Sequence, residues 1–177
     1  CKHRDFDPMA ISAMPVRFAS VLMCFSIAAQ LGLNCTSIDF SAAYTNVPMK
    51  RETWIYVPEG IEGIPTHGKD GQRRVAKVCN ALFGFKASGA AWAELLDTKL
   101  RWVGGLKQSY PDAPKVSGKP VPGVTVTPCK SDPNVYRYDR GGEVCIVCAY
   151  SDDCLLFSSC PKLRQDIVES LKEFKLR

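Results

Sequence analysis

Two adjacent carboxylates, Asp152 and Asp153, lie between two short apolar runs, 144–149 and 155–157. The runs have the length and the residue types of buried strands, so the segment predicts a β-hairpin with the acids at its tip. Repulsion and desolvation make it costly to keep two neighbouring carboxylates ionised beside apolar strands. A divalent cation removes that cost, because hard carboxylate oxygens suit Mg²⁺ and its charge offsets theirs. The alternative is a solvated Ser-Asp-Asp turn.

A third acid, Asp39, ends an alternating stretch at 34–39 and is followed by small residues and then by Tyr44. A carboxylate at the end of a strand can point into a cleft where a metal bridges it to phosphates, with Tyr44 as one wall. The alternative is an ordinary aspartate that caps the next segment.

The elements expected around these acids can bring them together. Apolar residues at helical spacing predict helices at 16–31, at 87–103 and from Pro161 onward. Short apolar or aromatic runs predict strands at 34–39, 52–57, 74–79 and 135–138, besides the hairpin. A strand-borne Asp39 and a hairpin-borne acid pair can then meet on neighbouring strands of an antiparallel sheet. We therefore expect an α+β fold, with the helices packed on one face of the sheet.

One segment, 104–130, differs from the rest of the chain in composition. It holds five of the 12 prolines, and its four lysines against one aspartate give it a charge of +3. Such a composition predicts a basic, Pro-rich surface insertion, and a flap that contacts nucleic acid is the alternative.

Length and composition predict a globular chain. Its 177 residues are 46% hydrophobic and 23% charged, and the net charge of +5 permits a polyanionic partner without demanding one. Of the nine cysteines, Cys145 and Cys148 form a CxxC, but residues three apart in a strand point to opposite faces. We expect free thiols in a reducing compartment rather than zinc, and no membrane association, because no apolar run has transmembrane length.

Five stretches in this order resemble those of reverse transcriptases from copia-type (Pseudoviridae-like) LTR retrotransposons. They are 28–33, 37–46, 82–86 with Trp92 following, 131–136, and the Tyr-Ser-Asp-Asp box at 150–153. The resemblance implies a right-hand polymerase palm with part of the fingers, acting as an RNA-directed DNA polymerase. The implied partners are an RNA or DNA template-primer, dNTP and the remainder of a Pol polyprotein, in cytoplasmic virus-like particles and also in the nucleus. Oligomeric state stays open.

The resemblance also implies a role for each site residue. Asp39, Asp152 and Asp153 would be catalytic and hold two Mg²⁺ ions, with Mn²⁺ as a substitute, helped by the Phe40 backbone. The residues implied at the nucleotide are Ala43, Tyr44 and Ala87, with Tyr44 excluding a ribose 2′-hydroxyl. The residues implied at the template or primer are Phe83, Gly84, Lys86 and Tyr150.

The chain departs from the family pattern in two places. Ala87, Ser88, Gly89 and Ala90 stand where the family has glutamine, alanine, proline and arginine, and Val47 stands where it has glycine. We expect residues 1–177 to be a palm and fingers fragment, with the thumb and RNase H lying outside it. A catalytically decayed retrotransposon remnant that keeps the palm fold is therefore the alternative function.

Overall fold

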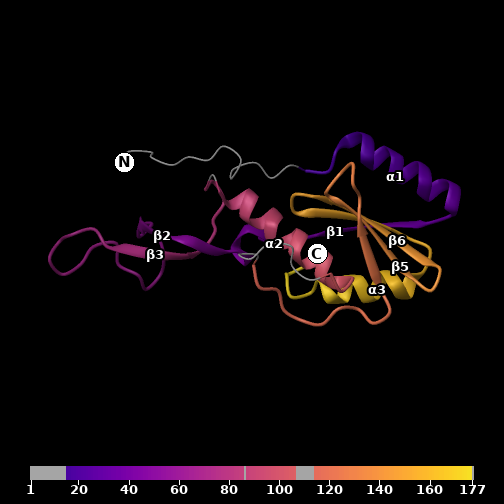
Figure 1. The fold of residues 1–177 in the computed structure, drawn as a ribbon. Coiled ribbons are helices and arrows are strands. Elements are labelled where there is room, and N and C mark those ends of the chain that lie inside the picture. Colours follow the sequence, from indigo (N-terminus) through magenta and orange to yellow (C-terminus); the bar gives the residue numbers. More distant parts are fainter. Residues whose placement is uncertain (1–14, 86, 107–113, 177) are drawn as a thin grey trace.

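The computed structural model describes residues 15–85, 87–106 and 114–176, and these form a mixed α+β fold with antiparallel sheets (Figure 1). The helices of the described residues are α1 (Phe18–Leu31), α2 (Ser88–Val103) and α3 (Pro161–Ser170), with a short 3₁₀ helix η2 (Ala43–Asn46). The strands are β1 (Asn34–Asp39), β2 (Pro48–Tyr56), β3 (Val75–Asn80), β4 (Thr125–Pro128), β5 (Val135–Arg140), β6 (Glu143–Tyr150) and β7 (Asp153–Ser158). The α+β class is confirmed.

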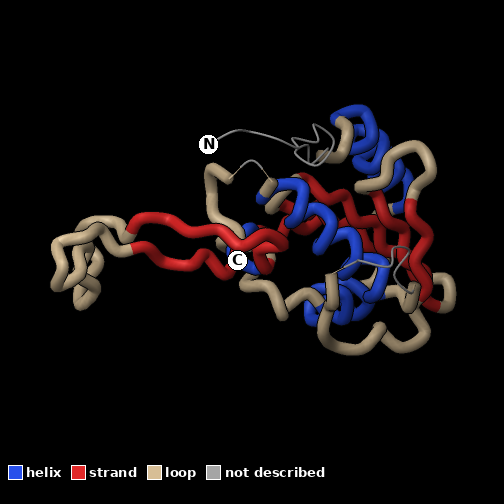
Figure 2. The backbone as a smooth tube through the Cα atoms, turned by 60° about the vertical axis from the view of Figure 1, so that its left-hand side comes forward, coloured by secondary structure: helices blue, strands red, loops and turns tan. Residues whose placement is uncertain are grey.

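The main sheet has five strands in the order β1-β7-β6-β5-β4, and every neighbouring pair is antiparallel. The strands β2 and β3 form a separate two-stranded ribbon that extends away from this sheet (Figure 2). The apolar strands β6 and β7 occupy the interior of the main sheet, where their side chains are covered on both faces. The hairpin predicted from the two apolar runs is therefore present, with Ser151 and Asp152 at its turn.

Helices cover both faces of the main sheet, so the expectation that they pack on one face is wrong. The helices α2 and α3 share one core with the sheet, in which Trp92, Leu163 and Tyr138 are buried. The helix α1 forms a second core on the opposite face, where Cys24 and Ala28 meet residues of β6 and β7 (Figure 1). The reason lies in β6, which alternates apolar residues toward both faces and would leave one set in water without α1.

The CxxC of β6 is divided between these two cores. Cys145 lies in the core under α2 and α3, and Cys148 lies in the core under α1. Both thiols are free, and burial raises the pKa of the Cys145 thiol to about 12. The two thiols therefore lie on opposite faces of the sheet, as the strand pattern predicted. None of the helices in the described ranges is long and apolar enough to cross a membrane.

The segment 104–130 is not simply a surface insertion. Residues 107–113 lie outside the described part of the chain, but 114–130 packs on the core and supplies the edge strand β4. Val121, Val124 and Val126 are buried. Lys99 of α2 is buried too, and its ammonium donates to the carbonyl of Ser117 at 2.6 Å. The composition suggested an exposed loop because lysines and prolines outnumber the few valines that anchor it.

Asp132 fixes the start of α1 against the sheet. Its carboxylate is buried and accepts hydrogen bonds from the Arg17 amide (2.9 Å), the Ser20 hydroxyl (2.6 Å) and the Asn134 amide (3.1 Å). Burial alone would raise the pKa of Asp132, but the hydrogen bond from Ser20 and those from the two amides outweigh it, and the pKa lies below its usual value. Asp132 therefore ties the residue before α1 and the first turn of that helix, which has no side-chain cap, to the turn before β5.

Replacing Asp132 by Ala should loosen α1 and destabilise the fold. Hydrogen bonds to a charged group are worth about 1.5–3 kcal/mol each and do not add fully, so we expect a loss of about 2–4 kcal/mol in urea unfolding. A lowered pKa gives stability that is present above the unfolded-state value near 4 and is lost as pH falls through the folded-state value. As the pH falls, the wild-type chain should lose this contribution to its free energy of unfolding, and the Asp132→Ala chain should lose less.

The matched control is Asp139→Ala, which ends the exposed ion pair between Asp139 and Arg137. Exposed pairs are worth about 0–1 kcal/mol, so this variant should stay close to wild type. Equal losses for the two variants would show that Asp132 does not hold α1.

Candidate active site

The backbone brings the three acids predicted from the sequence to one end of the main sheet. Asp39, the last residue of β1, is the register partner of Asp153, the first residue of β7. Register partners in an antiparallel pair have Cα atoms about 4.5–5.5 Å apart and side chains on the same face. Asp152 precedes Asp153 in the hairpin turn, and its carbonyl accepts a hydrogen bond of 2.7 Å from the Phe40 amide. The turn and the end of β1 are thus joined directly.

The acids interact through their charges. Partial burial raises the pKa of Asp153 first, and the negative charges of Asp152 and Asp39 raise it further. In kind, three carboxylates fit Mg²⁺ or Mn²⁺, which prefer hard oxygen ligands. Within the described ranges, however, the side chains nowhere form a ready group of three or more acidic, thiol or imidazole ligands. The backbone places the three acidic residues next to one another. Rotation about their side-chain bonds would have to bring their oxygens around an ion.

Both acid-bearing turns contain a residue with strained backbone geometry. Among the described residues other than glycine, only Ala42 and Ser151 have positive φ, each at 54°. The left-handed conformation costs a residue with a side chain about 1–2 kcal/mol. Ala42 lies three residues after Asp39, and Ser151 immediately precedes Asp152. A two-residue hairpin turn requires a positive φ at its first residue, which accounts for Ser151, and strain of this kind is also found at functional sites.

The strained Ser151 turn is held by Trp92 of α2. The buried indole donates its N–H to the Ser151 carbonyl at 2.8 Å. The ring also packs edge-to-face on Phe40 and Phe174, with centroids 5.3 and 5.1 Å away. Phe40 follows Asp39, so one indole supports both the β1 end and the hairpin turn. The residues after α3 join this support, because the Ser41 amide donates to the Lys175 carbonyl at 2.8 Å.

The residues expected at the nucleotide lie on η2 and at the start of α2. Ala43 is buried and opens η2, which packs against α2. The next residue, Tyr44, is half-buried, and its ring lies 4.7 Å from that of Phe83. Ala87 is exposed immediately before α2 and makes no side-chain cap. The Tyr44–Phe83 contact was not expected from the sequence.

The residues expected at the template or primer are mostly exposed. Phe83 has 62% of its side-chain surface exposed and Tyr150 has 55%. Gly84 has a φ of 87°, which the turn closed by the Phe85 amide and the Leu82 carbonyl requires. Lys86, the remaining residue of this set, lies outside the described residues.

A cavity of about 340 Å³ opens beside this region, between η2, α2 and the segment after α3. Its lining includes Asn46, Leu95, Lys115 and Glu173, but none of the three acids. The cavity is therefore not the place where the acids would meet a ligand, and we assign the site by the carboxylates instead.

Sequence reasoning missed the positioning roles of Trp92 and Phe174. The indole N–H of a buried tryptophan needs an acceptor, and that requirement could have pointed to a nearby turn. No protein-family model, no curated protein and no solved structure matches this chain. The assignment of the site therefore depends on its own geometry.

Replacing Trp92 by Phe should destabilise the acid-bearing turn more than the same change at Trp102. Both indoles belong to α2 and donate to a carbonyl, Trp92 to Ser151 and Trp102 to Gly118 at 3.2 Å. Trp92 is buried and Trp102 is only half-buried. We expect losses of about 2–4 kcal/mol for Trp92→Phe and below about 1 kcal/mol for Trp102→Phe in urea unfolding.

Amide hydrogen exchange should locate the difference. Trp92→Phe should speed exchange of the Phe40 amide, which bonds to the Asp152 carbonyl, more than it speeds exchange in β5. Uniform acceleration across the sheet would mean that Trp92 contributes packing alone.

Proposed function

We propose that the chain is the palm, with part of the fingers, of an RNA-directed DNA polymerase. It would transfer a nucleotidyl group from a dNTP to a primer 3′-hydroxyl on an RNA or DNA template. The observation that carries this proposal is the pairing of Asp39 with Asp153 on neighbouring strands, with Asp152 in the adjoining turn. Like charges held this close favour a bound cation as their function. The reaction is inferred from the resemblance of the Tyr-Ser-Asp-Asp box and the four other stretches to reverse transcriptases.

In this proposal the acids hold metal and the neighbouring residues hold nucleotide. Asp39 and Asp152 would be the principal ligands of two Mg²⁺ ions, with Asp153 and the Phe40 carbonyl alongside. When bound, such ions activate the hydroxyl and stabilise the charge on the leaving pyrophosphate. Tyr44, supported by Phe83, would exclude a ribose 2′-hydroxyl by steric contact.

The remaining predicted residues would contact the substrates from the surface. Ala43 and Ala87 would lie beside the nucleotide. The exposed Phe83 and Tyr150, with Gly84 and Lys86, would face template or primer. The remainder of a Pol polyprotein, including thumb and RNase H, would supply further duplex contacts to phosphates. The proposed compartments are the cytoplasm, in virus-like particles, and the nucleus.

A second candidate function is a catalytically decayed remnant that keeps this fold. The observation in its favour is the start of α2, where Ala87 is exposed and Ala90 stands two residues inside the helix. Neither side chain can hydrogen-bond, whereas the family resemblance implies a glutamine and an arginine there. Positioning alone can account for roughly 7–11 kcal/mol of a reaction barrier, so loss of nucleotide contacts could abolish activity while the acids remain in place.

Metal binding tests the site without requiring activity. Mn²⁺ should bind the chain, as followed by electron paramagnetic resonance, and Mg²⁺ or Mn²⁺ should raise the melting temperature through ligand linkage. Asp39→Asn and Asp152→Asn should each weaken Mn²⁺ binding about tenfold or more, because each removes a charged ligand. Asp139→Asn, on the exposed surface of β5, is the matched control and should bind Mn²⁺ as wild type does.

Asp153→Asn separates repulsion from metal binding. The raised pKa means that the folded chain holds this proton more tightly than the unfolded chain does, so stability falls as pH rises through the acid range. Without divalent metal, Asp153→Asn should therefore melt higher than wild type at pH 7 and equally at pH 3. Unchanged Mn²⁺ binding in Asp39→Asn and Asp152→Asn would contradict the proposed site.

Restoring the missing side chains distinguishes the two candidate functions. If the start of α2 has decayed, Ala87→Gln with Ala90→Arg should tighten dNTP binding roughly tenfold, since charge-assisted hydrogen bonds are the strong ones. The matched control is Ala90→Lys, which adds the charge without the planar donor pair. Efficient primer extension by the unmodified chain would overturn the remnant, and no gain from the double change would locate the defect elsewhere.

A further inference from the structure

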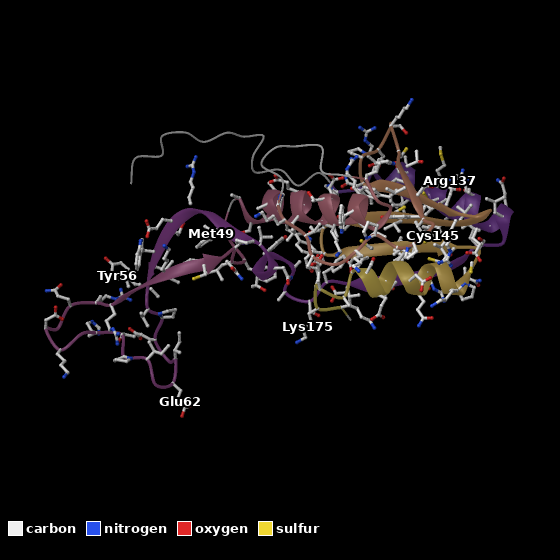
Figure 3. All side chains as sticks on the ribbon, turned by 60° about the horizontal axis from the view of Figure 1, so that its bottom comes forward. Met49, Tyr56, Glu62, Arg137, Cys145 and Lys175 are labelled. Carbon is white, nitrogen blue, oxygen red and sulfur yellow. The ribbon has the colours of Figure 1, made fainter. Side chains whose placement is uncertain are left out.

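The β2–β3 ribbon is a separate arm that carries exposed aromatic residues. It projects from the body of the molecule, and Tyr56 lies far along it from Cys145 in the main sheet (Figure 3). Trp54 has 55% of its surface exposed and Tyr56 has 60%. The two residues are two apart on β2, so their rings stand on the same face of the ribbon, about 6.5–7 Å apart along the strand. Their register partners on β3 are Lys77 and Val75.

Cations flank both rings on this face. The Arg73 guanidinium carbon lies 4.6 Å from the centroid of the Tyr56 ring, a cation–π contact. Lys77, opposite Trp54, forms an exposed ion pair of 3.1 Å with Glu52, which is the acid of this face. Among the described residues, no carboxylate forms an ion pair with Arg73. The face therefore alternates flat apolar rings with positive charge, and we refer to Trp54, Tyr56, Arg73 and Lys77 as the arm face.

We infer that the arm face binds single-stranded nucleic acid, with bases stacked on Trp54 and Tyr56 and phosphates beside Arg73 and Lys77. Stacking on aromatic rings tolerates any base, because every base has a π-face, and cations beside the rings hold the backbone. The spacing of the rings lets each take one base of an extended strand. This surface lies outside the acid cluster, and its binding does not require polymerase activity.

Charge favours nucleic acid over a protein strand as the occupant. The whole arm, 48–80, contains six basic residues (Lys50, Arg51, Lys69, Arg73, Arg74 and Lys77) and four acids (Glu52, Glu59, Glu62 and Asp70), a balance of +2. A polyanion matches that balance. A peptide that added to the ribbon as a further strand would use its edge backbone groups and would leave these rings exposed.

The test measures binding of fluorescein-labelled 20-nucleotide oligo(dT) to the 177-residue chain by fluorescence anisotropy. Trp54→Ala with Tyr56→Ala should weaken binding at least about tenfold, because two stacked bases are lost. Phe18→Ala, which removes a still more exposed ring on α1, should leave the affinity unchanged. Trp54→Phe with Tyr56→Phe should restore most of the affinity, since the rings are kept.

An abasic 20-mer of the same length separates stacking from charge. The chain with Trp54→Ala and Tyr56→Ala should bind the abasic strand as wild type does. Arg73→Gln should weaken binding of both probes, and it should reduce the slope of log affinity against log salt concentration by about one. Lys172→Gln, which removes an exposed lysine of the ion pair with Glu169, is the charge control. An equal loss on both probes for the ring variant would overturn the stacking surface.

Two further results would overturn the inference and leave the proposed function standing. One is unchanged oligo(dT) affinity in the ring variant. The other is a wild-type dimer that the ring variant converts to monomer without any effect on oligo(dT), which would assign the face to a second copy of the chain. Conversely, Asp39→Asn should leave oligo(dT) binding intact while it weakens Mn²⁺ binding, so failure of the two proposals can be told apart.

Discussion

The hydrogen bond from the Trp92 indole to the Ser151 carbonyl is the contact on which the placement of Asp39, Asp152 and Asp153 depends. It joins α2 to the hairpin turn, and the edge-to-face packing of the Phe40, Trp92 and Phe174 rings extends the same support to β1 and to the residues beyond α3. Three segments that are distant in sequence therefore meet under Asp39 and Asp152. A buried indole is suited to this role, because its ring supplies a large apolar area while its single N–H must find an acceptor. The register of β1 against β7 then sets Asp39 opposite Asp153. The two carboxylates repel each other, but the packing beneath them prevents the backbone from moving them apart.

An ion pair between the buried Lys99 and the more exposed Glu173 makes the middle of the chain part of the same fold. The Lys99 ammonium is buried, lies 2.6 Å from a Glu173 carboxylate oxygen and donates to the Ser117 carbonyl. Glu173 also accepts hydrogen bonds from the Ser117 amide and hydroxyl. Breaking such a pair leaves an uncompensated buried charge at a cost of about 3–5 kcal/mol, so α2, the turn after α3 and the segment around Ser117 must order together. The basic, Pro-rich segment is thereby attached to the core near the aromatic cluster rather than left as an appendage.

Sequence reasoning succeeded where local periodicity decides the structure. The helix predicted from Pro161 onward is present as α3, although it ends at Ser170, and the strand pattern placed Cys145 and Cys148 on opposite faces. It failed where distant contacts decide. In the sequence Asp132 is an ordinary turn residue, because its partners Arg17 and Ser20 lie more than a hundred positions away. The helix α1 is apolar around most of its circumference, so its sequence does not indicate which side packs or that it covers the second face of the sheet. The Tyr44–Phe83 contact and the strain at Ser151 likewise depend on tertiary packing.

The strain at Ala42 and Ser151 bears on whether the acids form a site or a solvated turn. Glycine at either position would remove a penalty of about 1–2 kcal/mol, at the cost of a softer turn. The fold keeps side chains there and offsets the strain with specific hydrogen bonds: two from Thr45 to the Ala42 carbonyl and one from Trp92 to the Ser151 carbonyl. A two-residue hairpin turn requires a positive φ at its first residue, so the conformation of Ser151 reverses the chain, and its side chain makes the turn beside Asp152 more rigid than glycine would. The same reasoning does not extend to Ala87 and Ala90, neither of which has a positive φ. Under the proposed function, two requirements would be separate: the placement of the acids would be enforced by packing, while the grip on a nucleotide would depend on side chains that the start of α2 does not carry. A chain could keep the first after losing the second.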